Sequence, residues 1–171
     1  RTCLVGSEMC IRDSIKTVLL FNKIDDIKDD YINKMDELIS IYTNAGYDCI
    51  KISGKKSINI DKLRSIMLNK SCVFSGHSGV GKSTLINRLD SKINIKTLPI
   101  SKSNLSGQHT TTFSEMYDLE FGSRIIDTPG IKGFGLYDTD KYELKDFFKE
   151  FTLLEACKFN NCLHQDEPGC M

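Results

Sequence analysis

In the first half of the chain, short apolar runs alternate with segments whose apolar residues recur at helical spacing. Residues 17–21, 49–52 and 71–75 are short apolar runs, which is typical of strands buried in a parallel sheet. The segments between these runs carry apolar residues at helical spacing, among them Met35, Leu38 and Leu63. This βαβαβ order predicts an α/β fold with a doubly wound, mostly parallel sheet.

The second half of the chain has a different pattern. Residues 84–89 are suited to a helix, whereas residues 92–107 are polar and predict a loop. Residues 111–119 and 123–126 predict an antiparallel strand pair that turns at residues 120–122. Leu144, Phe147, Phe148 and Phe151 recur at helical spacing. They predict an amphipathic helix over residues 142–151.

A glycine-rich segment lies between the third predicted strand and the next helix. Its spacing, Gly76-x4-Gly81-Lys82-Ser83, fits the phosphate-loop pattern in the structural context that this pattern requires. In such a loop we expect backbone amides at the start of the helix to bind phosphate oxygens, Lys82 to contact the β and γ phosphates, and the Ser83 hydroxyl to bind Mg²⁺. The predicted phosphate-binding residues are Gly76, Ser78, Gly79, Val80, Gly81, Lys82, Ser83 and Thr84.

A guanine-specificity pattern follows the first predicted strand. Asn22-Lys23-Ile24-Asp25 matches N-K-x-D, in which the carboxylate accepts hydrogen bonds from guanine N1–H and the exocyclic amine. The motif is weak alone, but beside a phosphate loop it becomes specific because the two bind opposite ends of one ligand. Ser53-Gly54-Lys55, after the next strand, resembles the S-A-K loop whose backbone supports the base. We therefore predict that Asn22, Lys23, Asp25 and Ser53 bind GTP.

The switch motifs follow the phosphate loop. Asp127-Thr128-Pro129-Gly130 resembles D-x-x-G, in which Asp127 binds Mg²⁺ through water and Gly130 contacts the γ phosphate, although D-x-P-G is also an ordinary turn. A threonine among residues 110–112 is expected to bind Mg²⁺; Thr111 is our candidate, but the pattern does not single it out. Ile131 stands where a water-positioning Gln is usual. Besides Lys82, the catalytic candidate is His109, which lies next to these threonines in the sequence. That His109 is an incidental loop residue is an equal alternative.

Balanced charge and the absence of long apolar stretches limit the possible partners. Lys plus Arg and Asp plus Glu each number 23, so a nucleic-acid contact would need a local basic patch. No stretch approaches the roughly 20 apolar residues of a membrane helix, and the N-terminus lacks a signal-peptide pattern. These features predict a cytoplasmic protein with no membrane partner.

Residues 1–14 differ from the rest of the chain. Met9-Cys10-Ile11-Arg12-Asp13 looks like the translation of a transposase sequencing adapter, so we expect residues 1–14 to be non-native. A genuine linker or strand is the alternative. We expect a GTPase domain over residues 15–152 and a metal-binding module, truncated at its end, over residues 153–171.

Cysteines and one histidine gather in the last part of the chain. Cys157, Cys162, His164 and Cys170 offer thiolates and an imidazole within 14 residues, which suits a closed tetrahedral zinc site. Iron–sulfur ligation would favour cysteines throughout, and chance spacing is the other alternative. A closed ligand set leaves no position for water, so the expected Zn²⁺, one per chain, is structural.

The motif order is circularly permuted, because N-K-x-D precedes the phosphate loop and D-x-x-G comes after it. A doubly wound sheet tolerates this rearrangement where its original ends lie close together. This order, the segment Gly107-Gln108-His109-Thr110-Thr111-Thr112 and the terminal cysteines resemble the bacterial ribosome small-subunit-dependent GTPase A family over residues 15–171. Gly79 stands where potassium-dependent GTPases have Asn, so we predict no potassium dependence.

The resemblance implies a GTPase that acts late in small-subunit maturation, with an oligonucleotide-binding barrel before the GTPase domain. Its implied partners are the small ribosomal subunit, its rRNA and GTP or GDP, and we expect a monomer. One alternative is a permuted GTPase of large-subunit assembly. Another is a GTP-dependent RNA-binding switch with negligible hydrolysis.

Overall fold

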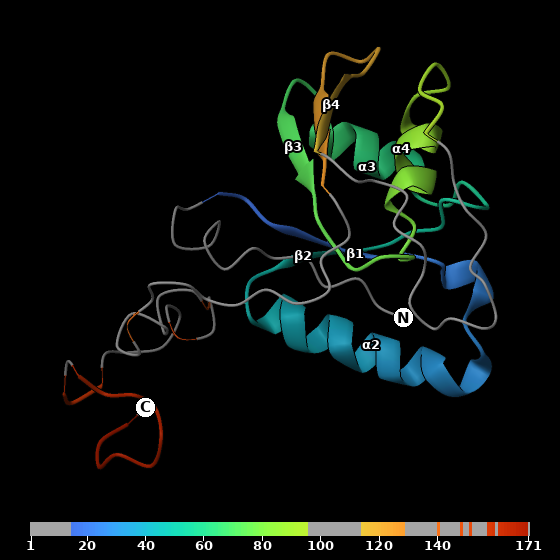
Figure 1. Cartoon of the computed structure of the whole chain (residues 1–171). Helices are drawn as coiled ribbons and strands as arrows, with labels where there is room; N and C mark the ends of the chain where they lie inside the picture. Colours follow the sequence, from blue (N-terminus) through green and yellow to red (C-terminus); the bar gives the residue numbers. More distant parts are fainter. Residues whose placement is uncertain are drawn as a thin grey trace.

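The computed structural model describes residues 15–95, 114–128, 140, 148, 151, 157–159 and 161–170. Strands and helices alternate in the first half, as the sequence predicts, and a strand hairpin follows (Figure 1). The elements are β1 (Val18–Phe21), η1 (Ile24–Asp26), α2 (Asp29–Asn44), β2 (Asp48–Lys51), α3 (Ile60–Met67), β3 (Ser71–Phe74), α4 (Lys82–Leu89), β4 (Glu115–Asp118) and β5 (Arg124–Asp127). Among the residues described, no helix is long and apolar enough to cross a membrane.

The strands pair as the sequence predicts but are divided between two sheets. β1 and β2 pair in parallel, with Leu20 opposite Ile50. In the other sheet, β3 and β5 are parallel and β4 is antiparallel to β5, giving the order β3-β5-β4. The α/β class, the parallel pairing and the predicted hairpin are therefore confirmed. In the part of the chain described here, however, β1 and β3 belong to separate sheets, which hydrophobic pattern alone cannot reveal.

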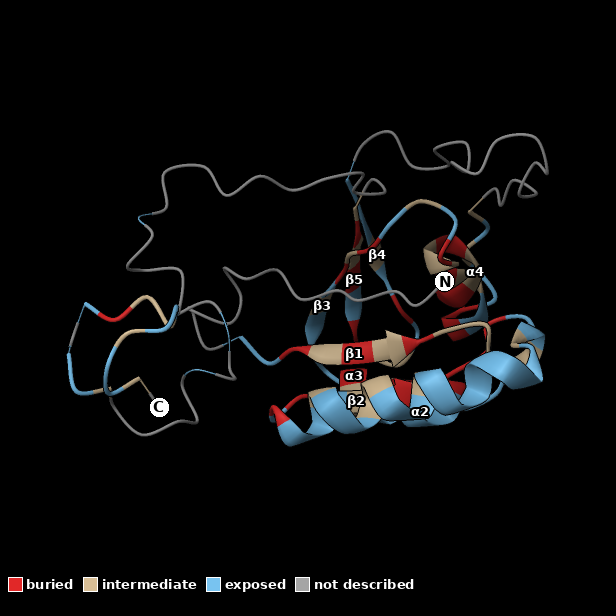
Figure 2. Ribbon diagram, turned by 90° about the horizontal axis from the view of Figure 1, so that it is seen from below, coloured by how far each residue is buried: buried red, intermediate tan, exposed pale blue. Residues whose placement is uncertain are grey.

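Two apolar clusters form the core. The larger lies where α3 and α4 cover one face of the β3-β5-β4 sheet, and its Ile52, Ile86 and Ile125 have no exposed surface. The smaller joins Leu19 and Phe21 of β1 to the inner side of α2. Figure 2 shows the alternation of half-buried and buried residues along β1 and the mostly exposed outer surface of α2. These contacts place the C-terminal ends of β1 and β3, where the sequence motifs begin, on a packed scaffold.

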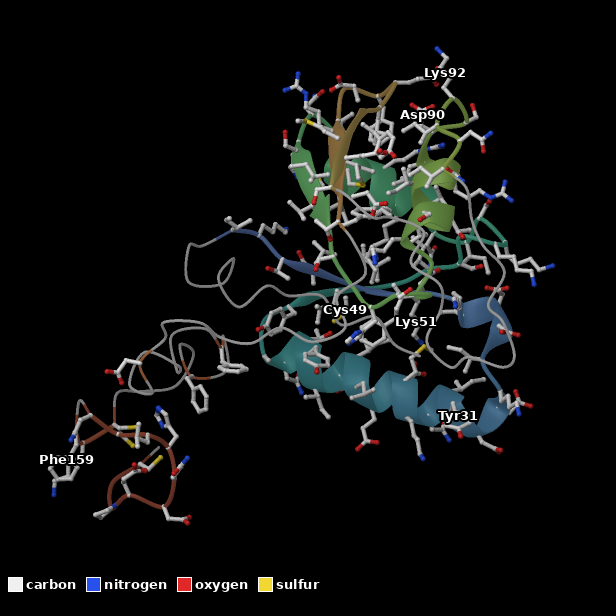
Figure 3. The ribbon with its side chains drawn as sticks, viewed as in Figure 1. Tyr31, Cys49, Lys51, Asp90, Lys92 and Phe159 are labelled. Carbon is white, nitrogen blue, oxygen red and sulfur yellow. The ribbon has the colours of Figure 1, made fainter. Side chains whose placement is uncertain are left out.

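A buried carboxylate fastens the end of α4 to the β4–β5 turn. Asp90, which is 3% exposed, accepts hydrogen bonds from the backbone N–H groups of Lys92 and Glu120, both at 2.9 Å. Lys92 also forms an ion pair with Glu120 at 2.7 Å (Figure 3 labels Asp90 and Lys92). The hydrogen bond from Lys92, followed by that from Glu120, lowers the pKa of Asp90 against the opposing effect of burial.

We expect Asp90→Asn to destabilise the fold by about 1–2 kcal/mol at pH 7, because an amide NH₂ cannot accept both backbone hydrogen bonds. A depressed carboxyl pKa contributes stability above the unfolded value of about 4, and this stability is lost as pH falls through the folded value. The difference in unfolding free energy between the unmodified protein and the Asp90→Asn variant should therefore become smaller on acidification. Urea unfolding from pH 7 down to pH 3 measures this difference, with exposed Asp26→Asn as the control. A difference in unfolding free energy that did not change with pH would contradict this role for Asp90.

Candidate nucleotide site and metal centre

The phosphate loop connects β3 to α4 and depends on glycine at its end. Gly79 and Gly81 have φ of 79° and 102°, a region that L side chains rarely adopt. A Cβ atom on Gly81 would lie 2.5 Å from Nδ2 of Asn22. Glycine is therefore required at position 81 both by backbone conformation and by the close approach of the guanine motif.

The first turn of α4 carries the residues predicted to bind phosphate and Mg²⁺. Lys82 Nζ donates hydrogen bonds to the carbonyl oxygens of Gly76 at 2.6 Å and His77 at 3.4 Å, which places its charge over the loop. Ser83, the next residue, is buried. The N-terminus of α4 adds a partial positive charge at the same place. Loop, cation and helix end are thus brought together as a phosphate site requires.

Asn22 joins the guanine motif to both neighbouring loops. Its Nδ2 donates to the carbonyl oxygen of Val80 at 2.9 Å, and its Oδ1 accepts from the backbone N–H of Gly54 at 3.2 Å. Lys23 Nζ donates to the carbonyl oxygen of Gly79 at 2.6 Å. The N-K-x-D segment therefore lies against the phosphate loop, although 58 residues separate Asn22 from Val80.

Asp25 is held by a serine from the S-G-K loop. The fully buried Ser53 donates its hydroxyl to Asp25 Oδ1, and Ser53 Oγ accepts the backbone N–H of Lys56 at 2.9 Å. The hydrogen bond from Ser53 lowers the pKa of Asp25, against the opposing effect of burial. Asp25 is thus an ionised acceptor at neutral pH. The sequence indicated the loop backbone as support for the base, but not this contact of the Ser53 side chain.

The D-x-x-G segment begins beside the phosphate loop. Asp127 ends β5 directly opposite Phe74, the last residue of β3, and its side chain is fully buried. Thr128 Oγ1 donates to the carbonyl oxygen of Phe74 at 2.9 Å. Asp127 therefore starts its loop where β3 enters the phosphate loop. His109, Thr111 and Gly130 lie outside the described residues.

The predicted metal ligands form one cluster. The ligand atoms of Cys157, Cys162, His164 and Cys170 all lie within 4.8 Å of one another. His164 Nδ1 is 3.6 Å from Cys157 Sγ, 3.9 Å from Cys162 Sγ and 3.4 Å from Cys170 Sγ. Tetrahedral coordination with metal–sulfur and metal–nitrogen distances of about 2.3 and 2.0 Å would place nitrogen and sulfur about 3.5 Å apart. The cluster can therefore hold a metal, with Nδ1 of the imidazole as its nitrogen ligand.

Two residues support the metal ligands: Glu167, which the sequence did not single out, and Phe151, which it indicated only as part of an amphipathic helix. The Glu167 carboxylate accepts backbone N–H groups from Leu163 at 2.9 Å and Gln165 at 2.6 Å, which bracket His164. The ring of Phe151 stacks on the His164 imidazole with centroids 4.4 Å apart. Outer groups of this kind fix the orientation of metal ligands. No local pattern indicates this role for either residue, because both act through folded geometry.

The comparisons with known proteins agree with this geometry. A model of the RsgA GTPase family matches residues 8–137. The small ribosomal subunit biogenesis GTPase RsgA of Flavobacterium psychrophilum is 52% identical over 157 residues, which cover 91% of this chain and 48% of that protein. RsgA of Bacteroides fragilis is 47% identical over 153 residues, covering 89% and 49%. The chain thus spans about half the length of these curated relatives.

Solved structures give the same relationship. YjeQ from Thermotoga maritima matches with a TM-score of 0.77 and 32% identity, covering 95% of this chain and 53% of that one. YloQ, described as a circularly permuted GTPase, shares the fold with a TM-score of 0.69 at 24% identity, covering 97% and 54%. The permuted motif order and the family match together lead to one conclusion: the chain belongs to the RsgA GTPase family.

Proposed function

We propose that the chain carries the nucleotide site of a GTPase that hydrolyses GTP to GDP and phosphate. The observation that carries the proposal is the position of Asn22, whose side chain hydrogen-bonds to both the phosphate loop and the S-G-K loop. These hydrogen bonds hold the two loops against each other, which supports one site that binds a base at one end and phosphate at the other. A ligand with a guanine base and a polyphosphate suits both.

The individual roles follow from chemistry and motif. Lys82 compensates phosphate charge, Ser83 and Thr111 bind Mg²⁺ directly, and Asp127 binds it through water. Gly130 contacts the γ phosphate, and His109 positions the attacking water in place of the usual glutamine. Ser78, Gly79 and Thr84 complete the contacts of the loop and helix end with phosphate.

We further propose that the GTPase acts late in maturation of the small ribosomal subunit and that nucleotide state controls its binding and release. The names of the relatives support a role in biogenesis of the small ribosomal subunit. Its partners would be the subunit and its rRNA, contacted by a monomer in the cytoplasm. GTP turnover with purified small subunits, with large subunits and with neither tests the proposal. Stimulation by large subunits alone, or no turnover under any condition, would contradict it.

The Cys/His cluster is proposed to hold a structural Zn²⁺. Thiolates and imidazole are ligands that zinc prefers, and the His164 nitrogen and the three sulfurs lie at distances suited to tetrahedral coordination. Zinc bound by these four groups would have no open position for substrate or water. Its contribution would therefore be to order the module, not to take part in hydrolysis.

Asp25→Asn is the most direct test of the guanine assignment. We expect GTP binding to weaken about a hundredfold, because the amide cannot accept both donors of the guanine edge. The variant should bind xanthosine triphosphate more tightly than the unmodified protein does, because the 2-oxo group of xanthine can accept a hydrogen bond from the new amide. Titration with GTP, ATP and xanthosine triphosphate measures this, with exposed neighbouring Asp26→Asn as the matched control. Equal affinity of the unmodified protein for ATP and GTP would refute the assignment.

A further inference from the structure

The S-G-K loop rests directly on α4 at Gly54. A Cβ atom on this buried glycine would lie 3.1 Å from Leu85 Cδ2 and 3.4 Å from Thr84 Cγ2. Arg88 Nε, from the last turn of α4, donates to the carbonyl oxygen of Gly54 at 3.1 Å. The backbone N–H of Gly54 donates to Asn22 Oδ1. Gly54 is thus held from two sides, by the helix that follows the phosphate loop and by the guanine motif.

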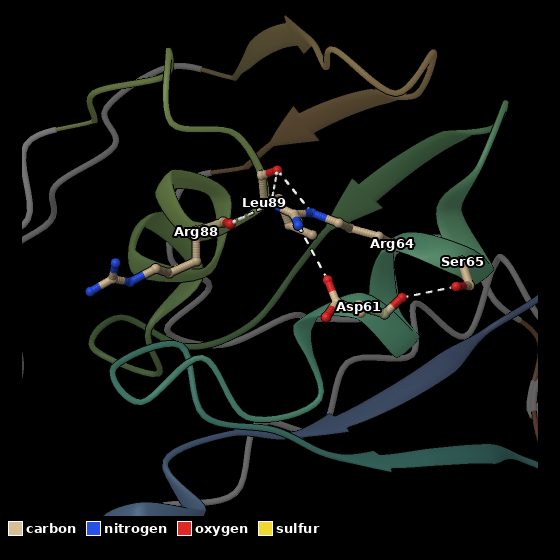
Figure 4. A network of polar contacts seen from close by, with 5 residues as sticks. All are labelled: Asp61, Arg64, Ser65, Arg88 and Leu89. Atoms are coloured by element: carbon tan, nitrogen blue, oxygen red, sulfur yellow. Dashed lines mark hydrogen bonds and ion pairs between the residues drawn. The ribbon is translucent and has the colours of Figure 1, made fainter.

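A second arginine fixes the helix end from which Arg88 reaches out. Arg64 of α3 donates from Nε and Nη2 to the carbonyl oxygen of Leu89, at 3.2 and 2.9 Å, and from Nη2 to that of Arg88 at 3.1 Å. In Figure 4 the Arg88 carbonyl faces Arg64, while the Arg88 side chain extends away from it. Arg64 thus anchors the Arg88 backbone, and the Arg88 guanidinium is left to hold the loop.

From this geometry we infer that Arg88 is a positioning residue for base recognition. It fixes the Gly54 backbone relative to α4 and so keeps the loop where a backbone N–H group would donate to the guanine O6 oxygen. This inference rests on the proposed GTPase function. Guanine O6 accepts a hydrogen bond, whereas adenine carries an amino donor at the same place. Amide donors therefore discriminate between the bases only while the loop is held in position.

Three nucleotides test the inference on the full chain. GDP and inosine diphosphate both carry O6, whereas 2-aminopurine riboside diphosphate lacks it. Arg88→Gln should weaken binding of GDP and inosine diphosphate equally, by about five- to tenfold, and change binding of the 2-aminopurine nucleotide less than twofold. Arg88→Lys should restore part of the loss, because a lysine can reach the same carbonyl without the planar fork.

Arg124→Gln, on β5, is the matched control, because its guanidinium pairs with Asp118 of β4 and not with the base loop. It should leave the affinities for all three nucleotides unchanged. Isothermal titration gives the affinities. Suppose that the unmodified protein prefers GDP to ADP, but Arg88→Gln weakens binding of all three nucleotides equally or of none. The inference would then be wrong, and the proposed function would stand. An unmodified protein that did not prefer GDP to ADP would overturn both.

Discussion

Replacing Lys82 with methionine should abolish measurable GTP hydrolysis, a loss of at least about a hundredfold, while the fold stays intact. The ammonium group lies over the phosphate loop and donates to the Gly76 carbonyl oxygen at 2.6 Å. With GTP bound, the same charge would compensate the negative charge that develops on the transferred phosphoryl group. Methionine keeps much of the length of the side chain but supplies no charge.

The measurement is phosphate release under conditions where the unmodified protein turns over, together with the unfolding midpoint in urea. Exposed Lys62→Met on α3 removes the same charge away from the loop and serves as the control. Its turnover should match that of the unmodified protein. Normal turnover of the Lys82→Met variant would show that the Gly76–Ser83 loop is not the catalytic phosphate site.

Local backbone requirements explain why the nucleotide motifs could be located from the sequence. The positive φ values of Gly79 and Gly81 are imposed on a few consecutive residues, so their signature is contained in the sequence. The strand before the loop and the helix after it are likewise short-range features. The sequence therefore predicted the glycine-rich turn between β3 and α4 and the two elements that flank it.

Contacts between distant segments could not be predicted in the same way. Arg88 and Gly54 are 34 residues apart, and neither belongs to a motif that would indicate their hydrogen bond. Periodicity likewise predicts that a segment is a strand but not which edge it pairs with, so it could not show that β1 and β3 belong to separate sheets. The support of His164 by Glu167 and Phe151 also depends on tertiary geometry.

Cys162→Ser should release the bound metal and unfold residues 157–170, with metal affinity lowered at least about a hundredfold. Cys162 is 4% exposed, and its sulfur accepts the backbone N–H of His164 at 3.4 Å. Replacing it therefore removes a ligand and a contact that orders the loop. The described core should survive, because neither apolar cluster includes a residue of this module.

Metal content and hydrogen exchange measure this outcome. Cys49→Ser, in β2, replaces a half-buried cysteine outside the ligand set and should retain the metal. A Cys162→Ser protein that kept its metal and its protection from exchange would show that Cys162 is not a ligand.

The same substitution tests whether the metal module and the nucleotide switch are coupled. Phe151, which comes after D-T-P-G in the chain, stacks on His164, a predicted metal ligand. If γ-phosphate contact at Gly130 orders the chain as far as Phe151, metal binding should favour the GTP-bound arrangement. Reciprocity then requires each ligand to strengthen binding of the other. Cys162→Ser should then narrow the affinity gap between a GTP analogue and GDP by about fivefold or more, the lower end of typical couplings. Both affinities are measured in the two proteins, with Cys49→Ser beside them. An unchanged ratio, together with unchanged nucleotide-dependent exchange around Phe151, would make the module a passive element that stabilises the chain or docks it to a partner.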